Sequence, residues 1–202
     1  MVDRRFPVTF LIAVAFAALI GWATPALPAD DSAESVILVA KRQLQDPFYR
    51  ATVVLTRPMG NDQHIGVILN RPSKLTLGQL FPDHKPSHLV RDPVYVGGPM
   101  STSVIFAIVQ RHDSPGGKSL QMMPEVFMVF EGSTVDQIIE KQPAQARFVA
   151  GLVAWQPGEL RDEIKRGAWY VLNADPALVL RKQTEGMWEE LVRRAEFSAN
   201  GI

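Results

Sequence analysis

A short apolar segment near the amino terminus limits which part of this chain can form a folded domain. Arg4 and Arg5 precede it, and the sixteen residues 8–23 contain no charged side chain. Small residues and two prolines occupy positions 24–29, and Asp30 follows them. A basic start, a short apolar centre and an exit rich in small residues are typical of a secretory signal peptide.

This pattern predicts the division of the chain and its compartment. We expect a signal peptide over residues 1–29, cleaved near residues 26–29, and a single domain over residues 30–202. The protein is then periplasmic or secreted, and no stable transmembrane segment remains after cleavage. The alternative is a membrane anchor formed by an uncleaved leader, because sixteen apolar residues fall only slightly short of the roughly 20 that span a bilayer.

Composition excludes several classes of protein. Removing 29 of the 202 residues leaves 173, which is enough for one domain with a substantial core. The chain has 21 basic and 21 acidic residues, and loss of Arg4, Arg5 and Asp3 leaves a net charge of −1. Proteins that bind nucleic acid concentrate positive charge, so we do not expect nucleic acid as a partner. The chain has no cysteine, so packing must stabilise it without disulfides.

Short strands and helices mix along the chain without a regular alternation. Apolar and β-branched runs predict strands at 36–40, 51–57, 64–70, 94–96, 104–110, 126–130, 146–155 and 169–172. Capping and periodicity predict helical segments near 46–49, 76–80, 133–142, 157–167 and 187–195, and a further helical turn capped by Asp175-Pro176. This mixture predicts one compact α+β domain rather than a doubly wound parallel sheet.

The sequence does not contain the motifs that are typical of metal sites, serine hydrolases or phosphate-binding loops. His84 and His88 have the spacing of two ligands on one helical turn, but Pro82 and Pro86 exclude a helix there. No serine lies in a GxSxG elbow, and the Gly97-Gly98 pair has no P-loop motif. We therefore predict no catalytic residues, no metal and no cofactor.

Two carboxylates on one predicted helix form the strongest candidate for acid–base chemistry. Glu159 and Glu163 lie four residues apart and share a helix face, as a general acid and base require. Acidic residues in the first turns of a helix also stabilise its dipole, and we favour this structural interpretation. We expect Trp155, just before this helix, to be mainly structural, with its indole packed in the hydrophobic core.

Several short motifs follow one another along the chain. They are Asp46-Pro47-Phe48, Thr52 to Leu55, Gly66 to Pro72, Leu75 to Leu80, Val96 to Pro99, Trp155 with Pro157 to Leu160, Glu163, Trp169 and Asp175-Pro176. Taken together, and covering roughly residues 36 to 190 in the same order, they resemble the motifs of the YqgE/AlgH family. The resemblance implies a compact α+β domain whose mixed or antiparallel sheet bends into a pseudo-barrel with flanking helices. The family is largely uncharacterised, some members are labelled transcriptional regulators, and the resemblance implies no catalytic residues.

The chain departs from this family in two ways. Its leader is unusual in a family whose members are mostly leaderless, and export argues against a direct role in transcription. The usual Trp-Gly-Pro-Gly-Gln motif is replaced by Trp155-Gln156-Pro157-Gly158-Glu159, which puts a charge where an amide is typical.

Seven residues form the predicted ligand-binding set. Gly97 and Gly98 allow the backbone to approach its neighbours closely, and Arg71 offers a forked donor for a carboxylate or phosphate. The alternative is that Arg71 only caps carbonyls of its own turn. The complete set is Asn70, Arg71, Gly97, Gly98, Trp155, Glu159 and Glu163.

We expect a non-enzymatic binding or regulatory-accessory protein exported to the cell envelope, with a small anion or a protein as its partner. One alternative is a hydrolase-like enzyme with a cleft near Arg71, Gly97 and Glu159, in which Glu159 or Glu163 acts as the general base. The other is a transcriptional regulator, which requires the leader to be a misassigned start.

The predicted leader can be tested directly. Amino-terminal sequencing of the protein from its own cells should find a first residue between Thr24 and Asp31, in the envelope fraction. An intact Met1 on protein from the soluble cytoplasm would contradict the prediction.

Overall fold

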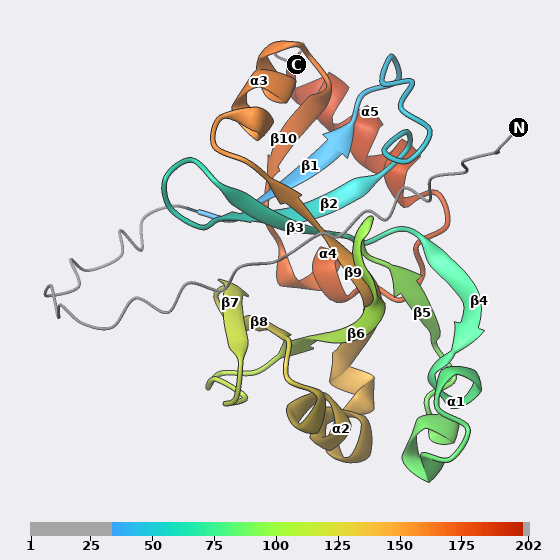
Figure 1. Cartoon of the computed structure of the whole chain (residues 1–202). Helices are drawn as coiled ribbons and strands as arrows, with labels where there is room; N and C mark the ends of the chain where they lie inside the picture. Colours follow the sequence, from blue (N-terminus) through green and yellow to red (C-terminus); the bar gives the residue numbers. More distant parts are fainter. Residues whose placement is uncertain (1–33, 200–202) are drawn as a thin grey trace, which may run out of the picture.

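The computed structural model describes residues 34–199. The predicted signal peptide and its cleavage site lie outside this range. Within it, ten strands form one strongly bent sheet with helices packed on its faces (Figure 1). None of the described helices is long and apolar enough to cross a bilayer.

The strands are mainly antiparallel, in the order β10-β1-β2-β3-β9-β6-β8-β7. Beside this path β5 pairs with β9 in parallel, and β4 pairs with β5. The strands are β1 (Val36–Ala40), β2 (Val53–Pro58), β3 (His64–Ile68), β4 (Pro72–Thr76), β5 (Pro93–Val96), β6 (Met100–Gln110), β7 (Ser119–Met123), β8 (Val126–Val129), β9 (Ala146–Trp155) and β10 (Trp169–Asn173).

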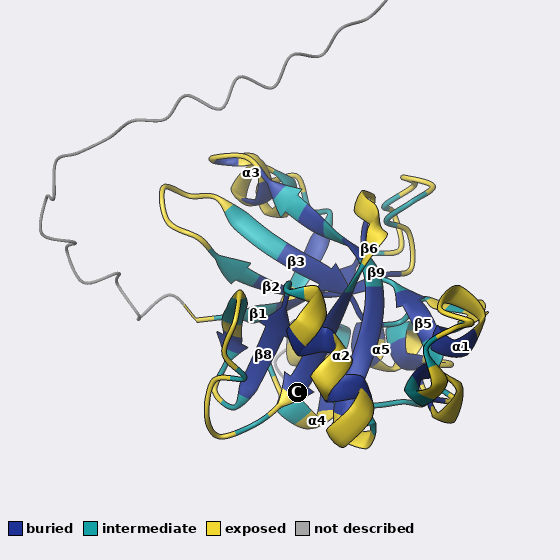
Figure 2. Cartoon of the chain, turned by 60° about the horizontal axis from the view of Figure 1, so that its bottom comes forward, coloured by how far each residue is buried: buried dark blue, intermediate teal, exposed yellow. Residues whose placement is uncertain are grey.

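The helices cover different parts of the bent sheet. They are α1 (Leu77–Leu80), η1 (Lys85–Leu89), α2 (Gly132–Lys141), η2 (Pro143–Gln145), α3 (Glu159–Lys165), α4 (Pro176–Leu180) and α5 (Met187–Ala199). Helix α5 packs on β1 and β10, whereas α2 and α4 pack on β6. The strands are largely buried, and the helices expose their outer faces (Figure 2). The expected α+β domain with a bent sheet is therefore confirmed, and the sheet curls into a half-barrel.

Strand β9 is bent, and it pairs with different neighbouring strands along its length. Residues 146–150 and Leu152 pair with β6, whereas residues 153–155 pair with β3. Gly151 interrupts the pairing with β6 and has φ of 77°, a conformation that favours glycine. The Gly97-Gly98 backbone crosses β9 here, and a Cβ atom on Gly98 would lie 2.0 Å from the carbonyl carbon of Leu152. Only glycine fits at this crossing.

A buried arginine lies on β9. Arg147 is 1% exposed, and its guanidinium donates to the carbonyl oxygens of Leu69 and Arg181. The guanidinium also lies 4.2 Å from the centre of the Tyr95 ring. Burial lowers the pKa of Arg147 to about 10, and the charges of Tyr95 and Asp92 partly oppose this effect. Among residues 34–199, Arg147 forms no ion pair with a carboxylate. Sequence reasoning did not single out this residue.

Most expected elements are present, but two strands were missed. The residues of β4 (PSKLT) are mostly polar and exposed, and β7 (SLQMM) contains no β-branched residue, so neither has a strand signature. Helix α2 begins at Gly132, because the carbonyl of Glu131 already accepts from the amides of Thr134 and Val135. The expected start at Ser133 was therefore one residue late.

The crossing at Gly98 predicts a large difference between two glycine substitutions. Gly98→Ala should lower the free energy of unfolding by about 3 kcal/mol or more, because its methyl group has no room beside Leu152. Gly132→Ala is the matched control: nothing lies within 4 Å of its Cβ position. The control should change stability by less than about 1 kcal/mol. Urea denaturation measures both, and equal effects would contradict this account of the bend.

Candidate functional site

The loop of residues 41–51, between β1 and β2, separates two pockets. Asp46 Oδ1 accepts from the backbone amides of Phe48 and Tyr49, each at 2.8 Å, and the Arg50 amide donates to the Asp46 carbonyl at 2.9 Å. These bonds form the expected capped helical turn. Arg50 lines one pocket and Tyr49 lines the other, while Leu44 lines both.

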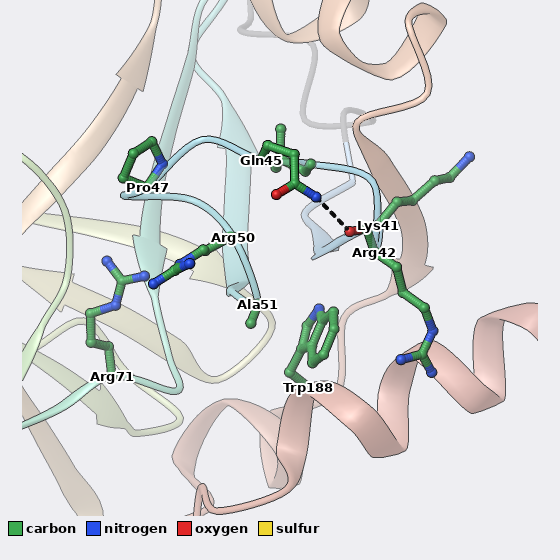
Figure 3. Close-up of a pocket in the computed structure, with 9 residues that line it drawn as sticks. Lys41, Arg42, Gln45, Pro47, Arg50, Ala51, Arg71 and Trp188 are labelled. Atoms are coloured by element: carbon green, nitrogen blue, oxygen red, sulfur yellow. Dashed lines mark hydrogen bonds between the residues drawn. The ribbon is translucent and has the colours of Figure 1, made fainter.

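The first pocket, which we call the basic pocket, is a cavity of about 570 Å³. It is lined by Lys41, Arg42, Leu44, Gln45, Pro47, Arg50, Ala51, Arg71 and Trp188. Four of these side chains are cationic and none carries a carboxylate. Figure 3 shows the guanidinium groups of Arg50 and Arg71 reaching toward each other from separate segments. The pocket is therefore a region of concentrated positive charge in a protein of nearly neutral net charge.

Arg71 is fixed at the wall of the basic pocket. Its Nη2 donates to the Phe48 carbonyl at 2.5 Å, and its guanidinium lies 4.8 Å from the centre of the Phe48 ring. Burial lowers the pKa of Arg71, and the nearby Arg50 charge lowers it further. The carbonyl that Arg71 binds belongs to the 41–51 loop rather than to its own turn.

The cationic side chains of the basic pocket have weak ion pairs with carboxylates or none. Arg42 Nε lies 3.5 Å from Glu196 Oε1, an ion pair between exposed side chains. Lys41 Nζ lies 4.8 Å from the centre of the Tyr170 ring. Among residues 34–199, neither Arg50 nor Arg71 forms an ion pair with a carboxylate. The indole of Trp188, which closes the pocket on α5, donates to the Ala40 carbonyl at 2.7 Å.

The second pocket, which we call the aromatic pocket, has a volume of about 330 Å³. Its lining residues are Gln43, Leu44, Asp46, Tyr49, Glu163, Arg166, Gly167, Ala168 and Trp169. Glu163 Oε2 accepts from both buried indoles behind it, at 3.0 Å from Trp155 Nε1 and 2.8 Å from Trp169 Nε1. One carboxylate oxygen therefore joins α3 to β9 and β10.

The aromatic pocket has a negative electrostatic environment. Burial raises the pKa of Tyr49, and the charges of Glu163, Asp46 and Glu159 raise it further, against a smaller opposing effect of Arg71. The rings of Tyr49 and Trp169 are 6.1 Å apart between centres and inclined at 76°. Charges of opposite sign thus line the two sides of a single loop.

The structure distributes the seven predicted ligand-binding residues over several places. Arg71 lines the basic pocket and Glu163 lines the aromatic pocket, with Trp155 bonded behind it. Asn70 binds the backbone: its side chain accepts from the Val53 amide and donates to the Ala51 carbonyl, both at 2.9 Å.

The remaining three predicted residues line neither pocket. Gly97 and Gly98 lie at the crossing over β9, where the Gly97 carbonyl accepts from the Ile68 amide at 2.8 Å. Glu159 Oε2 accepts from the Gln156 amide at 2.9 Å, at the start of α3. Ligand contacts of all seven residues stay predictions.

Several pocket residues were missed by sequence reasoning, namely Lys41, Arg42, Tyr49, Arg50, Trp169 and Trp188. One signal was present: three of these cations lie in a single loop between two neighbouring antiparallel strands. The approach of Trp188 from α5 had no signal in the sequence, because it depends on how α5 packs against β1.

Within residues 34–199, one histidine and one serine side chain lie within hydrogen-bond distance of each other, and no other histidine–serine pair does. His84 Nδ1 lies 2.7 Å from Ser87 Oγ, and His84 Nε2 lies 4.0 Å from Glu140 Oε1. Ser87 is 0% exposed, so its hydroxyl is not accessible to a substrate. This arrangement stabilises the turn at η1. No group of three or more histidine or acidic side chains in the described residues could hold a metal ion.

Comparison with known proteins identifies the family. The model of the AlgH-like family (DUF179) matches residues 37–200. The chain belongs to this family. A UPF0301 protein of Thermobifida fusca is 34% identical over 173 residues, covering 81% of this chain and 87% of the relative. A UPF0301 protein of Streptomyces coelicolor is 32% identical over 167 residues, covering 78% and 84%. The resemblance inferred from motifs is therefore confirmed.

Two solved structures share the fold of this AlgH-like protein. The solution structure of AlgH from Pseudomonas aeruginosa has a TM-score of 0.68 at 24% identity, covering 82% of this chain and 90% of the other. The crystal structure of DIP2367 from Corynebacterium diphtheriae has a TM-score of 0.65 at 23% identity, covering 84% and 90%. At these identities the likeness establishes the fold alone.

The environment of Tyr49 predicts a pH dependence. Since its pKa is raised above 10.0, the stability that the neutral phenol contributes is complete below pH 10 and is lost as the pH rises through the folded value. The difference in phenolate absorbance between the wild type and Tyr49→Phe measures this titration. Glu163→Gln should lower the pKa of Tyr49 by removing the largest charge effect. Titration of Tyr49 at or below pH 10 in the wild type would contradict the assignment.

Proposed function

We propose that this AlgH-like protein is a binding protein that takes a small anion in the basic pocket. The convergence of the Arg50 and Arg71 guanidinium groups on one cavity whose lining has no carboxylate carries the proposal. Bringing like charges together costs free energy, which a bound anion offsets. Guanidinium groups also present paired donors that suit carboxylate or phosphate oxygens.

The proposed role is non-enzymatic and lies in the cell envelope. The envelope assignment rests on the leader sequence, residues 1–29. The non-enzymatic role is supported by how the candidate bases are used: Glu159 accepts from a backbone amide, and Glu163 accepts from two indoles. Gly97, which belonged to the alternative hydrolase cleft, lies at a crossing of the backbone rather than in a pocket. These placements favour binding over hydrolysis.

Anion titrations of two arginine variants test the proposal. Inorganic phosphate and pyrophosphate should raise the melting temperature of the wild type, because a ligand that binds only the folded state stabilises it. Arg50→Ala should weaken anion binding roughly tenfold, because it removes one of the converging charges. Its stability without ligand should change by less than about 0.5 kcal/mol, because Arg50 is exposed.

The matched control is Arg91→Ala, which removes an exposed arginine that does not line the basic pocket. It should bind both anions like the wild type in calorimetric titrations. Equal binding by the wild type and Arg50→Ala, or equal losses in both variants, would contradict an anion site at the basic pocket.

A further inference from the structure

The aromatic pocket contains carboxylates that lack a cationic partner. Glu163 is half-buried, and one of its oxygens is bonded to the indoles of Trp155 and Trp169. Asp46 uses one oxygen to accept from two backbone amides. Within the described part of the chain, neither carboxylate forms an ion pair. The pocket therefore offers negative charge that the fold itself does not neutralise.

The walls of this pocket suit a soft cation. Tyr49 contributes a half-buried ring that packs edge-to-face on the buried Trp169, and Leu44 and Ala168 contribute apolar surface. Cations with alkyl substituents are attracted to aromatic rings while their alkyl groups contact apolar surface. Calcium and magnesium, by contrast, need six or more oxygen ligands, and this pocket presents two carboxylates.

We propose that the aromatic pocket binds an alkylated ammonium group. The cation sits against the ring of Tyr49, with Glu163 as its counter-ion. Arg166 also lines the pocket and is exposed, so its charge opposes the ligand at the rim. This site is separate from the basic pocket, and the inference does not depend on anion binding there.

Tetramethylammonium chloride is the probe for this proposal, with sodium chloride at equal ionic strength as the reference. Nitrogen-15 spectra resolve the indole N–H groups of Trp155, Trp169 and Trp188. Tetramethylammonium should shift the signals of Trp155 and Trp169, because both indoles donate to Glu163. The Trp188 signal should stay unchanged, because that indole belongs to the basic pocket. Equal shifts with sodium would overturn the proposal.

Variants of α3 separate a specific site from general charge attraction. Glu163→Gln keeps an oxygen that accepts from both indoles but removes the charge, and should weaken tetramethylammonium binding roughly tenfold. Asp162→Asn removes the same charge from an exposed neighbour that does not line the pocket, and should bind like the wild type. Arg166→Ala should strengthen binding by removing the opposing charge.

A variant of the loop provides a second test that does not alter the bonds of Glu163. Tyr49→Leu removes one aromatic wall and should weaken binding by a similar factor. Undiminished binding in both Glu163→Gln and Tyr49→Leu would overturn the proposal, as would equal losses in Glu163→Gln and Asp162→Asn.

Discussion

The close crossing of the Gly97-Gly98 backbone over β9 is the constraint on which the rest of the structure depends. It coincides with the irregularity at Gly151, just before β9 begins to pair with β3 at Val153. The bend carries Trp155 and α3 to the side of β1 and β10. The same crossing connects to Arg71, since the Val96 amide donates to the Arg71 carbonyl at 2.8 Å. One packing feature therefore positions residues of both pockets.

The 41–51 loop lies between the two pockets and contributes side chains of opposite charge to them. Asp46 fixes the turn, so that Tyr49 lines the aromatic pocket while Arg50 lines the basic pocket. The net charge of the whole chain hides this separation, because the cations and carboxylates cancel in the sum. Local charge, rather than net charge, is what a small ligand would encounter.

Sequence patterns predicted the fold well where the signals are local. The turn at Asp46, the strand ending at Trp155 and the helix capped by Asp175 all depend on residues close in sequence, and all are present. Strands β4 and β7 were missed because tertiary pairing, rather than local propensity, holds them in the sheet.

The candidate site was harder to predict than the fold. Arg71 and Glu163 were singled out, and Trp155 was expected beside the helix of Glu163, but Arg50 near Arg71 and Trp169 bonded to Glu163 were not anticipated. These contacts join segments far apart in the chain, so spacing in the sequence carries little information about them. Glu159 and Glu163 were predicted to share a helix face. Their carboxylates nevertheless bind different partners: Glu159 accepts from the Gln156 amide, and Glu163 accepts from the Trp169 indole.

The most direct test of the central claim, that the basic pocket binds an anion, is a nitrogen-15 titration of the three indole N–H groups with inorganic phosphate. Trp188 lines the basic pocket, whereas Trp155 and Trp169 are buried behind Glu163. The account predicts a saturable shift of the Trp188 signal and unchanged signals for the other two. An unchanged Trp188 signal, or equal movement of all three, would contradict it.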